Sequence, residues 1–161
     1  MILAIDPALG VTGAAGAALF RGGALVRCTY FVPPRKSPGE RIRLMCEALR
    51  AWLILTPTLA IYEWPQVYEN SPANPNDLVG LAAVGAAFAT ASRAGEQLTV
   101  LPREWKGSID GDTMVERIKA RLTPVEQALL PTGRLAHNAI DAVGIGLHHL
   151  GRLNRKRVIH R

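Results

Sequence analysis

Residues 2–32, ILAIDPALGVTGAAGAALFRGGALVRCTYFV, decide the fold class of this chain. The stretch begins with a continuous apolar run that ends at Asp6, a pattern typical of a short strand buried on both faces. Two more strands are predicted over residues 11–20 and 24–32, because the RGG sequence between them is typical of a hairpin turn. We therefore expect three consecutive strands at the start of the chain.

Helices and strands alternate after this meander. Residues 59–63, LAIYE, repeat the design of the first strand, and a fifth strand is predicted over residues 98–101. Apolar periodicity and capping residues predict helices over 40–55, 76–93 (capped by Asn76 or Asp77), 113–122 and 135–153, with a short helical piece after Thr123. This order is typical of the α/β fold class, with a five-stranded mixed sheet flanked by helices.

The composition fits a single folded domain that spans residues 1–161. Hydrophobic residues make up 48% of the 161 residues and charged residues 20%, which argues against intrinsic disorder. The longest charge-free apolar stretch, residues 78–92, is shorter than the roughly 18 residues of a membrane span. The N-terminus lacks the basic segment of a signal peptide, so we expect a cytoplasmic protein with no membrane partner. Cys28 and Cys46 have the spacing of neither a disulfide framework nor a zinc ribbon.

The chain is basic overall. Nineteen Lys and Arg residues against 13 Asp and Glu residues give a formal net charge of +6. Part of the surplus lies in a basic C-terminal tail at about residues 152–161, which contains no acidic residue. Such a tail is compatible with contact to a polyanion such as nucleic acid, and it is equally compatible with a solvated surface segment.

Two acidic residues follow apolar strands. If the strands that end at Asp6 and Glu63 are parallel neighbours, both carboxylates lie at the same end of the sheet. Two such charges repel each other, and a divalent cation is a common remedy. Taken singly, Asp6 is also explained by a turn before Pro7, and Glu63 by a solvent-exposed strand end.

A third acidic residue lies in the predicted last helix, within the sequence HNAID. His137 and Asn138 both share a helical face with Asp141, because their separations are four and three residues. The rest of that face is small or apolar. A histidine near a helix start is often only a cap or a surface residue, but three acids from two strands and one helix are a recurring way to hold hard cations.

These segments resemble RuvC-type Holliday junction resolvases, a family of the RNase H-like superfamily. ILAIDPALGVTGAAGAAL resembles the opening strand, turn and hairpin, AIYEWPQVY the second acidic strand, and HNAIDAVGIGLHH the C-terminal helix. The resemblance covers nearly the whole chain. It implies an RNase H-like fold, a homodimer, and paired Mg²⁺- or Mn²⁺-dependent cleavage of four-way DNA junctions with two ions per active site. A bacterial cell or a phage-infected host is the expected setting, and a thermophilic source is compatible with the excess of Arg over Lys.

The resemblance also assigns roles to individual residues. Asp6, Glu63 and Asp141 would be the catalytic and metal-binding acids. The family spacing points to Asn138 for the fourth position, but we favour His137, because an imidazole can bind a metal or take a proton from water. Lys106, in PREWKGS, resembles the first of two basic residues that the family carries after its fifth strand.

The chain departs from the family pattern at two positions and offers further candidate contacts. Met114 stands near the place of the second basic residue, and Ala8 stands where the family usually has Gly. Trp64 and Tyr68 are candidates for stacking on opened bases, although packing explains both aromatic residues equally well. The small-residue helix over 76–93, with Gly85 and Ala86, is the expected dimer contact.

Three other functions remain open at this stage. An RNase H-like nuclease could act on RNA or on another branched DNA. A junction-binding protein with a degraded site is also compatible with the neutral Asn138. The turn after Asp6 resembles the first phosphate loop of actin-like sugar kinases, but this chain is too short for the second domain that such enzymes need.

Overall fold

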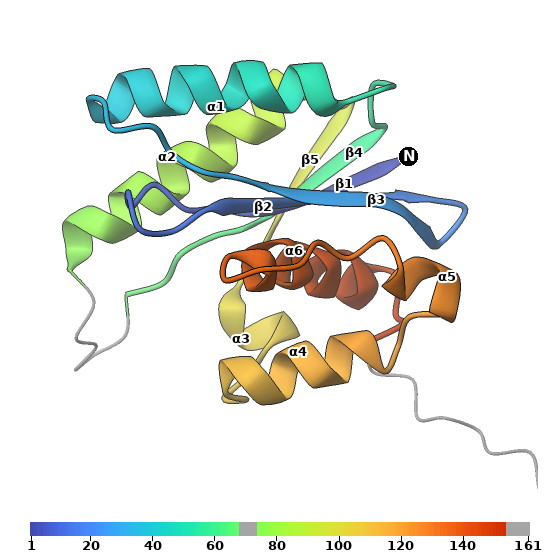
Figure 1. Cartoon of the computed structure of the whole chain (residues 1–161). Coiled ribbons are helices and arrows are strands. Elements are labelled where there is room, and N and C mark those ends of the chain that lie inside the picture. Colours follow the sequence, from blue (N-terminus) through green and yellow to red (C-terminus); the bar gives the residue numbers. More distant parts are fainter. Residues whose placement is uncertain (68–73, 154–161) are drawn as a thin grey trace, which may run out of the picture.

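The computed structural model describes residues 1–67 and 74–153. One five-stranded sheet lies between two groups of helices (Figure 1). Its strands are β1 (Ile2–Asp6), β2 (Ala15–Arg21), β3 (Ala24–Phe31), β4 (Leu59–Glu63) and β5 (Glu96–Val100). The spatial order is β3-β2-β1-β4-β5, in which β1, β2 and β3 pair antiparallel while β1, β4 and β5 pair parallel. The predicted α/β class, with an opening meander in a mixed sheet, is confirmed.

The second strand is shorter than its sequence pattern indicates. The structure begins it at Ala15 and not at residue 11, because the chain turns first, with the Gly13 amide donating to the Gly10 carbonyl at 3.0 Å. The hairpin that follows turns through Gly22 and Gly23. Both glycines have positive φ angles, 57° and 83°, which are costly for other residues.

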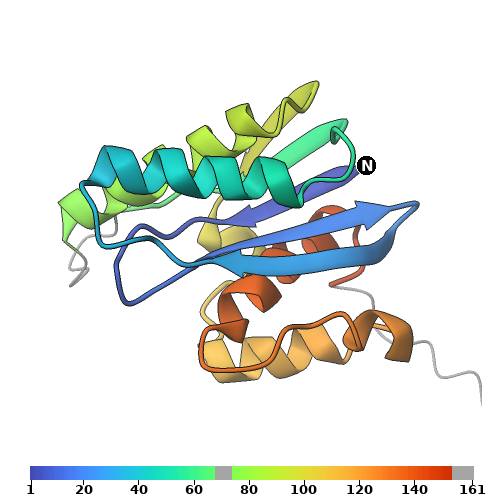
Figure 2. The ribbon, with the colours of Figure 1, turned by 45° about the horizontal axis from the view of Figure 1, so that its top comes forward.

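Helices cover both faces of the sheet (Figure 2). On one face lie α1 (Pro38–Trp52) and α2 (Pro75–Ala91), which pack on each other. The other face carries α6 (Ala136–His149), while α3 (Pro102–Trp105), α4 (Gly111–Lys119) and α5 (Pro124–Gln127) surround that helix and the β3 edge. The cap of α2 is Asn74, whose side chain accepts from the Asn76 amide, and neither Asn76 nor Asp77 has that role. None of the helices in the described ranges has the length and apolar character needed to cross a bilayer.

The alternation of β1 divides the core in two. Leu3 and Ile5 point toward α1 and α2, whereas Ala4 points toward α6, and all three are fully buried. Small residues allow the helices to approach the sheet closely. A Cβ at Gly146 of α6 would overlap the ring of Phe20 in β2. The alternation of β1 therefore provides apolar side chains on both faces of the sheet for helices to cover.

The small residues of α2 serve contacts within the chain. A Cβ at Gly85 would lie 2.5 Å from Cδ2 of Tyr62, so this glycine allows α2 to pack on β4. The expectation that Gly85 forms a dimer contact is therefore wrong, because the position is buried against the protein's own sheet. The outward face of α2 carries Val79, which is 69% exposed, and Ala83, which is also exposed.

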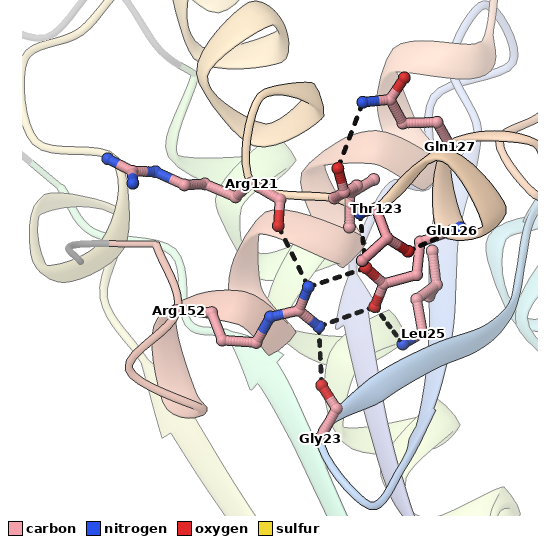
Figure 3. Close-up of polar contacts among 8 residues, drawn as sticks. Gly23, Leu25, Arg121, Thr123, Glu126, Gln127 and Arg152 are labelled. Carbon is pink, nitrogen blue, oxygen red and sulfur yellow. Dashed lines mark hydrogen bonds and ion pairs between the residues drawn. The ribbon is translucent and has the colours of Figure 1, made fainter. Parts of the chain in front are cut away.

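Arg152 belongs to the fold and not to a free basic tail. Its guanidinium donates to both carboxylate oxygens of Glu126, at 2.7 and 2.8 Å, and to the carbonyls of Gly23 and Arg121 (Figure 3). The Glu126 carboxylate also accepts from the Leu25 amide at 2.8 Å. This Glu126–Arg152 clamp joins the β2–β3 hairpin, α5 and the end of α6. The predicted tail from residue 154 onward lies outside the described residues.

Candidate active site

Asp6 and Glu63 are the last residues of β1 and β4. The two strands are parallel neighbours, with Ile2 opposite Leu59 and Ile5 opposite Tyr62. The two acidic residues that follow this register therefore lie at the same edge of the sheet. This is the arrangement that the repeated apolar run with a terminal acid predicts.

Asp141 reaches this edge because α6 lies directly against β2. Gly16 of β2 pairs with Asp6, and a Cβ at Gly16 would overlap the Asn138 carbonyl group of α6. The missing side chain thus allows the first turn of α6 to lie beside Asp6. Asp141 lies one turn further along α6, and its charge raises the pKa values of both Asp6 and Glu63, so the three carboxyl groups interact electrostatically.

Burial and neighbouring charges shift the pKa values of all three carboxyl groups. Burial raises the pKa of Asp6 well above its usual value, and the nearby carboxylates of Asp141 and Glu63 raise it further. Burial also raises the pKa values of Glu63 and Asp141, and Asp141 adds to the effect on Glu63. In addition, Oδ1 of Asp141 is buried without a hydrogen-bond partner. The site therefore lacks enough positive charge to balance its three acids.

Lys106 supplies part of that positive charge. Its Nζ lies 3.9 Å from Oδ2 of Asp141, and its charge lowers the pKa values of Asp6, Glu63 and Asp141 alike, against the larger effect of burial. Lys106 is the C-terminal capping residue of α3, a short helix that follows β5. This short connection brings Lys106 to the edge of the sheet where the carboxylates lie. The side chain is 28% exposed, which leaves its ammonium group within reach of solvent.

Trp105 is a site residue that the sequence reasoning missed. Its indole Nε1 donates a 2.7 Å hydrogen bond to Oε2 of Glu63, and this bond lowers the pKa of that carboxyl group. The ring is only 4% exposed. The signal that could have found it is a tryptophan next to the candidate Lys106, because a buried indole N–H requires an acceptor.

His137 and Asn138 differ in how their side chains are used. The His137 ring is exposed, lies near enough to lower the pKa of Asp141, and has its Nδ1 3.1 Å from the Arg134 carbonyl oxygen. A carbonyl oxygen only accepts, so Nδ1 is the donor in this contact and Nε2 is left for another partner. Asn138 is buried, and its Nδ2 donates to the Leu135 carbonyl at 3.0 Å. His137 is therefore more accessible to a metal ion than Asn138. Its role stays a prediction.

The remaining candidates lie at varied distances from the carboxylates. Trp64 directly follows Glu63, is 41% exposed, and lies with its ring tilted by 60° against Tyr62 at 6.2 Å between centroids. Tyr68 lies outside the described residues. Met114 is fully buried in the core on α4, which explains why an apolar residue stands there.

The donor set suits a hard divalent cation. Carboxylate oxygens are the ligands that Mg²⁺ prefers, and the buried, unpartnered Oδ1 of Asp141 is available to one. Within residues 1–67 and 74–153, however, no group of three or more His, Cys, Asp and Glu side chains is already close enough to hold a metal ion. An ion would therefore have to draw the carboxylates together and take over the balancing charge that Lys106 now supplies.

Comparison with known proteins identifies the fold of this chain. No family model and no curated sequence matches the chain. Among solved structures, the chain is similar to RuvC of Thermus thermophilus bound to a Holliday junction substrate, with a TM-score of 0.61 and 15% identity over 92% of this chain and 91% of that one. The chain has a RuvC-type, RNase H-like fold.

Two further structures share this fold. A second Thermus thermophilus RuvC structure gives a TM-score of 0.59 and 16% identity over 92% of both chains. The yeast mitochondrial Holliday junction resolvase gives a TM-score of 0.52 and 15% identity over 94% of this chain and 79% of that one. The similarity in fold thus extends over nearly the whole chain.

Proposed function

We propose that this protein is a structure-selective endonuclease that resolves four-way DNA junctions by metal-dependent hydrolysis of phosphodiester bonds. One observation carries the proposal: Asp6, Glu63 and Asp141 come from three elements of a RuvC-type fold and meet at one edge of the sheet, short of positive charge. Such a set of buried acids costs stability, so its presence favours a cationic ligand and a polyanionic substrate.

The chain's own residues supply separate parts of the chemistry. Asp6, Glu63 and Asp141 would hold Mg²⁺ or Mn²⁺, with His137 as a fourth group. When bound, two such ions stabilise the attacking and leaving oxygens of an in-line displacement at phosphorus. His137 would orient or deprotonate the attacking water through Nε2, because its Nδ1 contacts the Arg134 carbonyl oxygen. Lys106 would then turn its charge from Asp141 to the scissile phosphate, because the two groups compete for the same ammonium.

Resolution of a four-way junction needs two cuts, and we propose a homodimer that supplies two such sites. The outward face of α2 supports this, because Val79 is 69% exposed and Ala83 beside it is small and exposed. An apolar helix face of this kind allows close approach by a second copy. Trp64 would stack on bases opened near the cut, which its 41% exposure and its place beside Glu63 support.

The test offers the purified protein a labelled four-way junction, a duplex of matching sequence, a flap, a fork and an RNA–DNA hybrid, each with Mg²⁺ and with EDTA. Paired nicks in the junction with Mg²⁺, and none with EDTA, are the expected result. Equal cutting of the duplex would remove the selectivity for junctions. Cutting of a flap, a fork or an RNA hybrid in preference to the junction would move the proposal to another branched substrate.

A protein that binds junctions without cutting them is the second candidate. It is favoured by the absence, in the described ranges, of a preformed metal group and by the position of Lys106 next to Asp141. Tight junction binding together with no cleavage in Mg²⁺ or Mn²⁺ would establish this function in place of the nuclease.

A further inference from the structure

Trp105 connects the α3 segment to one of the three site carboxylates. Its indole Nε1 donates to Oε2 of Glu63 at 2.7 Å, across 42 positions of sequence. The ring is 4% exposed, so an indole N–H without this acceptor would be buried and unpaired. Such a group costs the full desolvation of a donor, which opposes any rotation of Glu63 away from the ring.

Helix α6 holds the indole ring in place. A Cβ at Gly144 would lie 2.8 Å from Cζ3 of Trp105 and 2.6 Å from Cδ1 of Ile118. The missing side chain at this position therefore makes room for both residues between α6 and its neighbours. Asp141 lies three residues before Gly144 on α6. The same helix therefore carries one site carboxylate and packs against Trp105, which binds the carboxylate of Glu63.

The residue after Trp105 contacts a different carboxylate. Lys106 Nζ lies 3.9 Å from Oδ2 of Asp141 and 5.7 Å from the centroid of the Trp105 ring. Consecutive residues thus contact Glu63 and Asp141. The Lys106 contact is electrostatic and partly exposed, whereas the Trp105 contact is short, directional and buried. Trp105 is accordingly the better suited of the two to fix a position.

We propose that Trp105 is a positioning residue that holds Oε2 of Glu63 and leaves Oε1 to bind a divalent cation. This inference rests on the proposed function, because it places Glu63 in a metal site. Mg²⁺ demands near-octahedral geometry and dehydrates reluctantly, so a single carboxylate oxygen in a fixed place suits it. Outer partners of metal ligands typically change metal affinity or activity ten- to a hundredfold when removed.

The first test compares Trp105→Phe with Ile118→Val. The phenylalanine keeps an aromatic ring but has no N–H donor, whereas valine at 118 removes packing near Gly144 without contact to Glu63. We expect Trp105→Phe to raise the Kd for Mn²⁺, measured by calorimetry, about ten- to a hundredfold. Ile118→Val should stay within about twofold of the parent protein. An unchanged Kd in folded Trp105→Phe would overturn the inference.

The second test needs no variant at position 105. The chain has three tryptophans, so its ¹⁵N spectrum has three indole signals, and Trp52→Phe and Trp64→Phe assign them by elimination. On addition of Mg²⁺, we expect the Trp105 signal to shift along the same isotherm as Mg²⁺ binding measured by calorimetry, while the Trp52 signal stays in place. Ion binding without a shift of Trp105 overturns the positioning role. If calorimetry detects no ion binding to the parent protein, the metal site of the proposed function fails instead.

Discussion

Removal of the Glu126–Arg152 clamp is expected to destabilise the fold by an amount that depends on pH. Glu126 is 4% exposed and accepts from Arg152 and from the Leu25 amide. These contacts lower its pKa from 4.5 to about 2. At about 1.4 kcal/mol per pKa unit, the ionised carboxylate contributes about 3 kcal/mol of folding free energy at neutral pH. Removal of one partner from a buried ion pair typically costs about 3–5 kcal/mol of folding free energy, which agrees with this value.

The sign of the pH dependence follows from the lowered pKa. A carboxyl group with a depressed pKa in the folded state stabilises fully above its unfolded pKa, and this stabilisation is lost as the pH falls through the folded value. The free energy difference between the parent protein and Glu126→Gln should therefore be about 3 kcal/mol at pH 7 and shrink between pH 4.5 and 2. Urea unfolding followed by tryptophan fluorescence measures it. The raised pKa values of Asp6, Glu63 and Asp141 cancel in this difference, because both proteins contain them.

A surface pair provides the matched control. Arg43 and Glu47 form an ion pair at 2.7 Å on α1, but their side chains are 59% and 50% exposed. Loss of such a pair in Glu47→Gln should cost only about 0.3–0.5 kcal/mol. A Glu126→Gln effect no larger than that of Glu47→Gln, or one that does not change with pH, would refute the reasoning about the clamp.

Four more outcomes are expected. Asp6→Asn and Glu63→Gln should abolish Mg²⁺-dependent nicking but retain junction binding in a gel shift, and full activity in both would remove the metal site. Asp141→Asn should raise the melting temperature of the metal-free protein by a few degrees at pH 7, on the order of 1 kcal/mol, because it removes a buried charge whose pKa is raised. This gain in melting temperature should fade as the pH falls, because the carboxyl group of the parent protein then takes up a proton. His137→Ala should slow cleavage more than Asn138→Ala, and the reverse order would show that the family register is the better guide to the fourth position. Lys106→Ala should reduce cleavage more than binding. The affinity for the junction should fall steeply as the salt concentration rises, and an affinity that stays constant between about 50 and 200 mM salt would contradict the electrostatic contribution.

The parts of the fold that local sequence controls were predictable. Continuous apolar runs mark β1 and β4 as buried strands, and an acid at the end of each places Asp6 and Glu63 at one edge. The longer helices also followed from apolar periodicity and capping residues, whereas the short α3 was not predicted. Boundaries shifted where a turn or a cap decides them, as at Ala15 and Asn74.

Contacts between distant segments account for what the sequence did not reveal. The acceptor of the Trp105 indole lies 42 positions away, and the Leu25 amide that binds Glu126 lies 101 positions away. Neither contact produces a periodic pattern in the sequence from which it could be predicted. Gly85 shows the same limit, because a small residue fits a dimer contact and a close helix–sheet contact equally well, and only the position of Tyr62 separates the two.

Asp141→Asn provides the most direct test of the central claim, that three converging carboxylates make this fold a metal-dependent junction nuclease. The measurement is the rate of nicking of a labelled four-way junction in Mg²⁺ by the parent protein and by Asp141→Asn, with junction binding by both measured in the same buffer. We expect paired nicks from the parent protein, and from the variant junction binding of similar affinity with no cleavage. Cleavage by Asp141→Asn at the parent rate would contradict the claim.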